Sequence, residues 1–160
     1  MPKTMSPIPA LSLSIRPAER RDIPDLLIMI DALASQNHDR MRLDEWSLID
    51  ILFAPSPWVR ILVAENHNEV VGYAALVGGL QLQFGARTMD LHHLYVKDGL
   101  RGLGVGRALI DAARATARNL GCVRLTVGTH TENTRAQAIY QASGFTRIQP
   151  RGPRYEMALN

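Results

Sequence analysis

A glycine-rich turn at residues 101–106 constrains this chain more than any other feature of its sequence. The apolar residues 94–96 come directly before the turn and predict a buried strand, and a helix is expected to begin near Gly106. Glycines lack the Cβ atom that would keep a ligand away from the backbone. The free N–H groups at the start of a helix form the positive end of the helix dipole. The turn, flanked by Arg101 and Arg107, therefore predicts a phosphate-binding site.

The spacing of the glycines excludes two common phosphate-binding motifs. The Walker motif requires a Lys followed by Ser or Thr after its last glycine, whereas Arg107-Ala108 stands here. The dinucleotide fingerprint requires G-x-G-x-x-G, whereas this chain reads G-x-G-x-G. The remaining pattern, Arg-x-x-Gly-x-Gly beginning at Arg101, resembles the acyl-CoA pyrophosphate loop of the GNAT acetyltransferase superfamily.

A second segment resembles the other half of the same family signature. After a further apolar strand, Asn133 opens a predicted helix, Tyr140 follows, and the pair Gly144-Phe145 closes the helix. The order of the predicted elements resembles that of the family from about residue 13 to 149, whereas the specific motifs occupy 90–107 and 133–145. The resemblance implies an α/β fold in a single domain, with a GNAT-like mixed, mainly antiparallel twisted sheet flanked by helices.

The resemblance also implies acetyl-CoA as co-substrate and indicates the residues that bind it. We expect the backbone at 94–96 to hold the pantetheine arm, with the N–H group of Val96 as the candidate donor to the oxyanion. The glycine turn is expected to hold the pyrophosphate. Asn133 also fits the N-cap of its helix, and both roles are compatible. The predicted cofactor-binding residues are Leu94, Tyr95, Val96, Arg101, Gly102, Leu103, Gly104, Val105, Gly106, Arg107, Asn133, Arg135 and Ala136.

Tyr140 is the predicted catalytic acid. A phenol, with a reference pKa of about 10, stays protonated at neutral pH and can protonate a departing thiolate. The alternative is a tyrosine whose ring packs in the core and whose hydroxyl is satisfied by a local partner. The match from Asn133 to Phe145 favours the catalytic role.

The segment Asp90-Leu91-His92-His93 supplies candidates for the group that accepts the proton of the incoming amine. Strand alternation predicts Asp90 and His92 on one face and His93 on the other. Histidine is suited to accept a proton near neutral pH, and Asp90 can accept it or attract an ammonium substrate. Water is a third candidate, and each side chain also fits a structural role. No metal site is expected, because adjacent strand residues diverge and no third ligand is suitably spaced.

The acceptor remains open at this level. The order of elements resembles that of the diamine and spermidine/spermine acetyltransferase branch, but His92-His93 stands where that branch carries a Glu-Asp pair. The predicted function is transfer of an acetyl group to a primary amine of a small molecule, by direct attack in a ternary complex. The alternatives are a catalytically silent acyl-CoA sensor and an acetyltransferase for protein N-termini or lysines.

Composition limits the remaining classes. The 160 residues, of which 46% are apolar, suit one domain at 11–160, and the prolines in 1–10 predict a flexible arm. The 18 basic and 15 acidic residues are interleaved, so no nucleic acid is expected. The chain has no apolar run of membrane-spanning length and no signal peptide, which favours a cytoplasmic protein. A homodimer is expected from the resemblance and from a possible edge strand at 154–160.

Hydrophobic periodicity predicts the secondary structure. Trp46, Ile49, Leu52 and Phe53 are expected to form the inward face of a short helix capped by Asp44. A longer helix precedes it, with a buried face from Ile23 to Ala34, and two further helices are expected at 106–120 and 133–143. The expected strands are 11–15, 61–65, 70–76, 80–84, 89–96, 122–127, 145–149 and 154–159.

Overall fold

The computed structural model describes residues 11–159, so the predicted arm at 1–10 lies outside the described residues. The chain forms two compact units, Met1–Gly128 and Thr129–Asn160. Within the described residues, the first unit contains five strands and the helices α1, α2 and α3, and the second contains the helix α4. None of these helices is long and apolar enough to cross a membrane.

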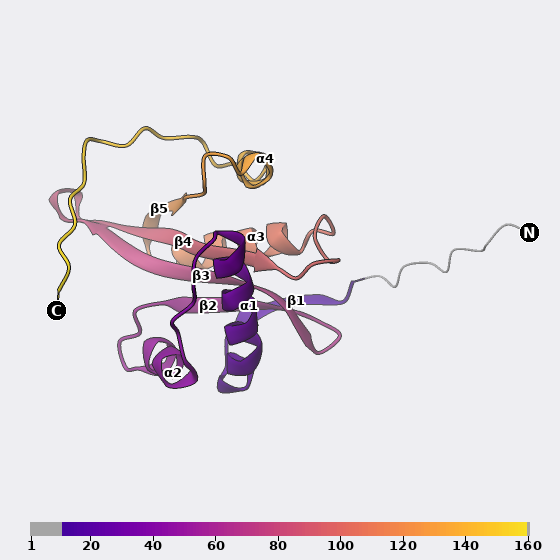
Figure 1. Ribbon diagram of the computed structural model, residues 1–160. Helices are drawn as coiled ribbons and strands as arrows, with labels where there is room; N and C mark the ends of the chain where they lie inside the picture. The colour runs from indigo at the N-terminus through magenta and orange to yellow at the C-terminus, as the bar shows by residue number, and fades with distance from the viewer. Residues whose placement is uncertain (1–10, 160) are drawn as a thin grey trace, which may run out of the picture. The chain divides into compact units, whose positions relative to one another are not determined.

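One mixed sheet forms the centre of the first unit (Figure 1). Its strands lie in the order β1-β2-β3-β4-β5, which is also their order along the chain. Neighbouring strands from β1 to β4 are antiparallel, and β5 is parallel to β4. The predicted α/β class with a mainly antiparallel sheet is confirmed. The strands are β1 (Leu13–Pro17), β2 (Arg60–Asn66), β3 (Glu69–Gln81), β4 (Ala86–Val96) and β5 (Cys122–Val127).

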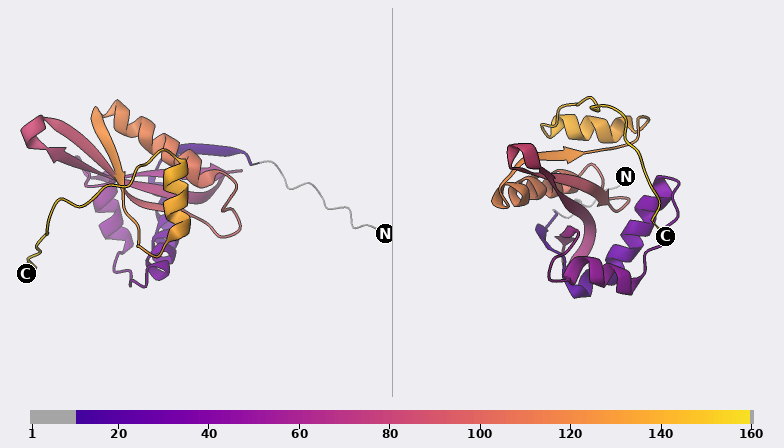
Figure 2. Two further views of the ribbon diagram at one scale, coloured as in Figure 1. Left: turned by 90° about the horizontal axis from the view of Figure 1, so that it is seen from above. Right: turned by 90° about the vertical axis from the view of Figure 1, so that its left-hand side faces the viewer.

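The helices of the first unit cover both faces of the sheet. Helices α1 (Ile23–Gln36) and α2 (Glu45–Phe53) lie on one face and α3 (Val105–Asn119) lies on the other, as the right-hand view of Figure 2 shows. Side-chain alternation along β2 explains this arrangement. Ile61 and Val63 belong to the hydrophobic core that is formed together with residues of α1 and α2. Their neighbours on β2 are also buried, since α3 contacts the opposite face.

A charged cluster joins β1, β2 and the start of α1. Arg16 donates two hydrogen bonds to Asp22, at 2.7 and 2.9 Å, and one to Glu65 at 2.7 Å. The N–H group of Glu19 also donates to Asp22. Burial on its own would raise the pKa of Asp22, but the bonds from Arg16 and Glu19 outweigh it and hold that pKa below its usual value. Asp22, although only 2% exposed, is therefore ionised and fully partnered.

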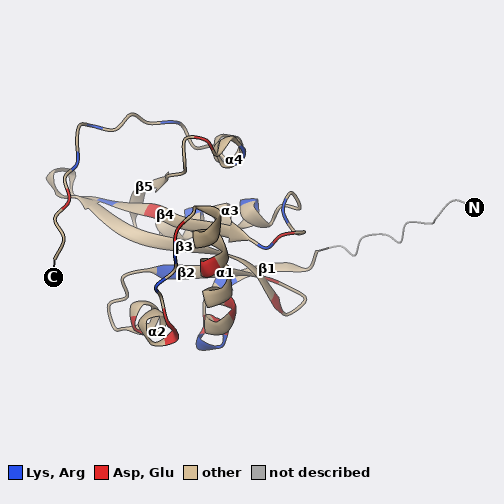
Figure 3. Cartoon of the chain, in the orientation of Figure 1, with Lys and Arg blue, Asp and Glu red and all other residues tan. Residues whose placement is uncertain are grey.

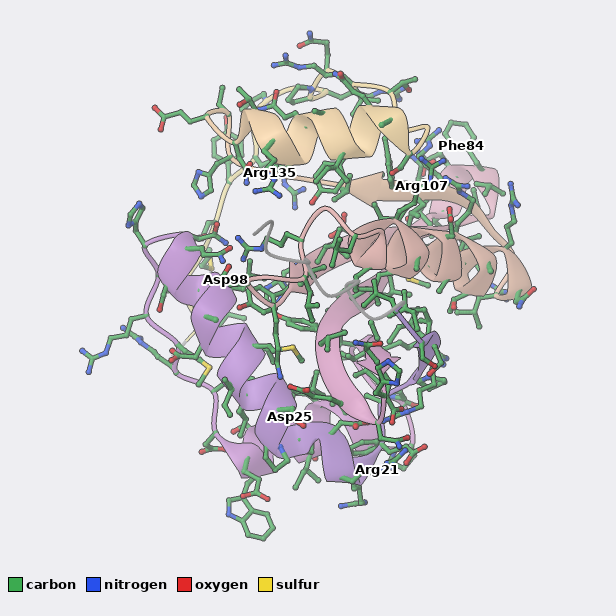
Figure 4. All side chains as sticks on the ribbon, turned by 90° about the vertical axis from the view of Figure 1, so that its right-hand side faces the viewer. Arg21, Asp25, Phe84, Asp98, Arg107 and Arg135 are labelled. Atoms are coloured by element: carbon green, nitrogen blue, oxygen red, sulfur yellow. The ribbon has the colours of Figure 1, made fainter. Side chains whose placement is uncertain are left out.

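Two hairpins connect β2 to β4, and the second differs from the prediction. The β2–β3 turn places His67 and Asn68 at φ 48° and 64°, as a type I′ turn requires. The sequence predicts two separate strands, 70–76 and 80–84, but β3 runs without interruption from Glu69 to Gln81. Residues 82–84 form a 3-10 turn at the tip of the hairpin. The prediction was wrong because the apolar side chains at the tip, including Phe84 at 68% exposure, are not buried (Figure 4).

Two further predictions are wrong, the inward face of the short helix α2 and the two strands near the end of the chain. The cap at Asp44, which accepts a hydrogen bond from the Ser47 N–H group at 2.8 Å, sets the phase of α2. Leu48 and Leu52 are therefore buried, whereas Trp46, predicted to face inward, is 79% exposed. The strands predicted at 145–149 and 154–159 are absent from the described part of the second unit. The apolar residues that suggested the last strand, such as Tyr155 at 92% exposure, bury no surface that would stabilise it.

Candidate functional site

One edge of β4 is open in the segment that leads into the glycine turn. On one side β4 pairs with β3 as far as Val96, but on the other it pairs with β5 only as far as Leu91. The N–H group of Lys97 donates to a β3 carbonyl at 2.9 Å. Because successive residues of a strand point their backbone polar groups to opposite sides, those of Leu94 and Val96 point to the open edge and those of Tyr95 point to β3. Leu94 and the N–H group of Val96 thus face the open edge, whereas the carbonyl of Val96 accepts a hydrogen bond from Arg101.

The glycine turn combines unusual backbone conformation with open space. Gly102 and Gly104 have φ angles of 77° and 90°, in the region that favours glycine. A Cβ atom built at either position would meet nothing within 4 Å, so the protein leaves the space in front of them open. Gly104 is the N-cap of α3, and the N–H groups of the first turn, Val105 to Arg107, have no partner within the helix. This arrangement suits an anionic ligand.

The two arginines that flank the turn differ in their contacts. Arg101 donates from Nε to the carbonyl of Val96 at 3.1 Å, pairs with Asp98 at 3.2 Å and lies 5.7 Å from the ring centre of Tyr95. Arg107 is exposed and projects from α3 (Figure 4). The loop after β4 carries charges of both signs (Figure 3). Arg101 is therefore held against the end of β4, whereas Arg107 points to solvent. Leu103, also predicted to bind cofactor, is 45% exposed.

A β-bulge changes the predicted faces of the two histidines. Ala75 of β3 pairs with His93, and the next residue, Leu76, pairs with Leu91, so His92 is an extra residue without a partner. The rings of His92 and His93 stack, with centroids 4.5 Å apart and planes 10° from parallel. The prediction that His93 lies on the opposite face from His92 is therefore wrong, because the bulge interrupts strand alternation.

His93 is fixed by a buried tyrosine. Its Nδ1 atom lies 3.0 Å from the hydroxyl of Tyr73, a side chain with no exposed surface. Burial, and then the neighbouring His92, lower the pKa of His93. Burial, and then Tyr95, raise the pKa of Tyr73. Both effects favour a pair in which Tyr73 and His93 are uncharged. The side chain of His92, in contrast to these two, is exposed.

Asp90 lies on the same face as His93, in the part of β4 that pairs with β5. Its partner across the β3 ladder is Val77, two residues from Ala75 on the same strand. The hydroxyl of Thr126 on β5 donates to the Asp90 carboxylate at 2.8 Å. The structure thus brings Asp90, His92 and His93 to one side of the sheet next to the open edge. Among the described residues, no three His, Cys, Asp or Glu side chains are grouped as a metal site would require.

In the second unit, α4 (Thr134–Ala142) is capped at both ends by residues of the sequence signature. Asn133 accepts a hydrogen bond from the N–H group of Ala136 at 3.0 Å, so its capping role is confirmed. After the helix, Gly144 has φ 97°, and Phe145 donates its N–H to the carbonyl of Tyr140 at 3.0 Å. This is a Schellman motif, which accounts locally for the Gly-Phe pair.

The Schellman motif also brings the ring of Phe145 against that of Tyr140. The two centroids are 5.8 Å apart in an edge-to-face arrangement, and burial raises the pKa of Tyr140. Arg135 is exposed on α4 (Figure 4). The Tyr140 hydroxyl is therefore kept protonated at neutral pH on a ring whose position is fixed by its own helix end.

Sequence reasoning missed three residues that shape the open edge. Tyr73 and Thr126 each lie inside an apolar segment that predicts a strand, and nothing in the sequence marks either residue as part of a site. Gly72 has a stronger signal, since glycine inside a strand often marks a close backbone approach. A Cβ atom at Gly72 would lie 2.7 Å from the carbonyl oxygen of Tyr95. Gly72 thus allows β3 and β4 to pair closely beside the site.

The sequence is similar to those of known acetyltransferases. Residues 26–145 match the profile of the acetyltransferase (GNAT) family. Thialysine N-epsilon-acetyltransferase of Bos taurus is 30% identical over 140 residues, which cover 81% of this chain and 82% of that protein. An N-acetyltransferase of Mycobacterium tuberculosis is 34% identical over 93 residues, covering 58% of this chain and 56% of its own length. The chain thus spans little more than half of that relative.

Solved structures share the fold at low sequence identity. An aminoglycoside acetyltransferase from an uncultured soil metagenomic sample, in complex with sisomicin, superposes with a TM-score of 0.76 at 17% identity. The match covers 92% of this chain and 97% of that one. An aminoglycoside N-acetyltransferase in complex with CoA gives a TM-score of 0.76 at 20% identity, covering 97% and 100%.

Proposed function

The chain belongs to the acetyltransferase (GNAT) family, and we propose that it is an enzyme that transfers the acetyl group of acetyl-CoA to a primary amine of a small molecule. The observation that carries this proposal is the open edge of β4, which runs directly into a glycine turn and the free N-terminus of α3. The relatives named for thialysine and for aminoglycosides support a small amine as acceptor.

The described residues fit the two chemically different parts of acetyl-CoA. The amide groups of the pantetheine arm can pair with the outward-facing backbone groups of Leu94, as a short strand would, which leaves the N–H group of Val96 for the thioester carbonyl oxygen. The pyrophosphate suits the N–H groups of the turn and of the first turn of α3, with Arg107 supplying charge. Asn133, Arg135 and Ala136 of the second unit remain predicted contributors to the same cofactor.

The proposed reaction is a direct attack of the amine on the thioester carbonyl. A C–N bond forms, the C–S bond breaks, and the electron pair leaves with the sulfur. The N–H group of Val96 stabilises the negative charge that develops on the carbonyl oxygen. Tyr140 donates its hydroxyl proton to the departing thiolate, and the ammonium formed at the acceptor nitrogen loses its proton to a base.

We propose His92 as that base, acting directly or through a water. It is exposed on the open side of the bulge and stacks on His93, whose ring is held by Tyr73. Asp90, fixed by Thr126, adds negative charge that favours a cationic acceptor. The stacked pair would keep the His92 ring in place while leaving its nitrogens accessible.

Initial rates with both substrates varied test this function. Direct attack in a ternary complex predicts intersecting lines in double-reciprocal plots and acetylated amine formed in step with CoA release. Parallel lines would contradict direct attack and indicate an acetyl-enzyme. Binding of acetyl-CoA without turnover on any amine of a broad panel would favour the silent sensor, and turnover on peptides alone would favour protein acetylation.

A further inference from the structure

A hollow in the first unit lies beside the β3–β4 hairpin, away from the glycine turn. A pocket of about 600 Å³ is formed by the segment before β2, the β3–β4 hairpin and the connection from α3 to β5. Its β4 residues, Arg87 to Met89, belong to the part of the strand that pairs with β5. Leu120, at the C-terminal end of α3, also lines it. The helix separates the pocket from the glycine turn by roughly 20 Å, given a rise of 1.5 Å per residue.

The pocket has an apolar floor and an apolar rim. Leu76 and Met89 form the floor and are 1% and 4% exposed, whereas Trp58 and Leu80 form the rim and are 80% and 60% exposed. A tryptophan and a leucine so exposed beside a hollow leave apolar surface that a ligand can cover. The volume lies within the range of about 300–1,000 Å³ that is usual for small-molecule sites.

A missing side chain creates the hollow. Leu76, Gly78 and Leu80 alternate along β3 and share the α3 face, since a Cβ atom at Gly72 on that face would contact Leu109 of α3. A Cβ atom at Gly78 would meet nothing within 4 Å. A larger residue at this position would therefore fill the pocket without displacing the protein around it.

The charge of the lining selects the kind of ligand. Arg60 and Arg87 line the pocket, and no Asp or Glu does. Neither arginine forms an ion pair with another residue in 11–159. Arg87 donates one long hydrogen bond, 3.4 Å, to the carbonyl of Leu120, which leaves its other N–H groups available. Two guanidinium groups without carboxylate partners above an apolar floor favour a negatively charged ligand.

We propose that this pocket binds a small molecule that carries one anionic group on an apolar body. The apolar body lies on Leu76 and Met89 beneath the indole of Trp58, and the anionic group accepts hydrogen bonds from Arg60 and Arg87. A medium-chain alkyl carboxylate such as octanoate has this chemistry. The site is separate from the proposed acetyl-CoA site and does not depend on it.

Tryptophan fluorescence tests the proposal with a probe that the pocket itself contains. The chain has two tryptophans, so Trp46→Phe leaves Trp58 as the single reporter. We expect titration with octanoate to give a saturable change, and octylamine, which has the same chain and the opposite charge, to give none. An equal response to octylamine and octanoate would overturn the assignment of an anionic ligand.

Variants in the Trp46→Phe background separate the pocket from non-specific binding. Gly78→Leu should abolish the octanoate response, and retained binding would overturn the proposal. Arg60→Gln should weaken binding about tenfold or more, as expected for the loss of one charge-assisted hydrogen bond. Arg118→Gln removes the same charge from an exposed position on α3 outside the pocket and should leave binding unchanged. An equal loss in Arg60→Gln and Arg118→Gln would overturn the role of Arg60.

The single cysteine gives a second readout. Cys122 lines the pocket and is partly exposed. Octanoate should slow the reaction of Cys122 with a thiol reagent in the parent chain and not in Gly78→Leu. A reaction rate unaffected by saturating octanoate would contradict binding at this place. A thermal melt and an acetyl-CoA titration of Gly78→Leu confirm that the variant is folded.

Discussion

Two ring contacts involve residues of the predicted site, Tyr73 with His93 in the first unit and Tyr140 with Phe145 in the second. In each contact burial disfavours the charged form of one ring, lowering the pKa of His93 and raising that of Tyr140. Both residues are therefore uncharged near neutral pH, as the proposed proton donor Tyr140 and the ring that supports the proposed base His92 should be.

Tyr140→Phe should lower kcat by about 10²–10⁴, the loss usual for a positioned general acid, while the affinity for acetyl-CoA stays nearly unchanged. The substitution keeps the ring that contacts Phe145, so the melting temperature should change little. Steady-state kinetics with the best amine and a thermal melt measure both effects. Wild-type kcat would contradict the catalytic role, and a large fall in the melting temperature would favour the packing role.

The neutral form of His93 predicts a pH dependence of stability. Its pKa in the folded state lies below the ordinary value of 6.5, so the unfolded chain binds the proton first as the pH falls. The free energy of unfolding should therefore decrease as the pH falls below about 6.5, by at most about 1.4 kcal/mol per pH unit, until His93 is protonated in the folded state. His93→Gln should reduce this slope in urea unfolding between neutral and mildly acidic pH, and exposed His130→Gln should not.

Among the elements, the junction of β1, β2 and α1 depends on one buried carboxylate. Asp22→Asn leaves Arg16 without its main partner, although Glu65 remains. Breaking a buried pair in this way costs about 3–5 kcal/mol. Urea unfolding should show this loss for Asp22→Asn and a loss below about 1 kcal/mol for Asp111→Asn, whose exposed carboxylate pairs with Arg114. Equal losses in the two variants would contradict the structural role of Asp22.

The sequence predicts best those helices whose ends are determined by capping residues next to them in the chain. The helix α3 begins and α4 begins and ends within a residue or two of expectation, because Gly104, Asn133 and Gly144 encode their caps. The bulge at His92 depends on how β4 pairs with β3, a non-local property with no local signal. The backbone groups at the open edge are thus predictable from the motif, whereas the shared face of His92 and His93 is not.

For the molecule as a whole, the sequence predicts a homodimer. Part of that prediction rested on an edge strand at 154–160, and residues 154–159 form no strand in the structure. The homodimer now rests on the family resemblance alone. Light scattering at tens of micromolar protein should give the mass of two chains of 17.7 kDa. A monomeric mass would exclude the dimer and leave the proposed chemistry intact.

Thermal denaturation with increasing acetyl-CoA tests the central claim, that the glycine turn and the open edge of β4 bind this cofactor. We expect the melting temperature to rise with the concentration of acetyl-CoA, because a ligand that binds only the folded state stabilises it. At a concentration one hundred times the Kd, this stabilisation is about 2.7 kcal/mol. Gly104→Leu should abolish the rise by blocking the backbone, whereas Gly99→Leu, which carries the same backbone strain at φ 83° outside the turn, should retain it. No rise with millimolar acetyl-CoA or CoA would contradict the account.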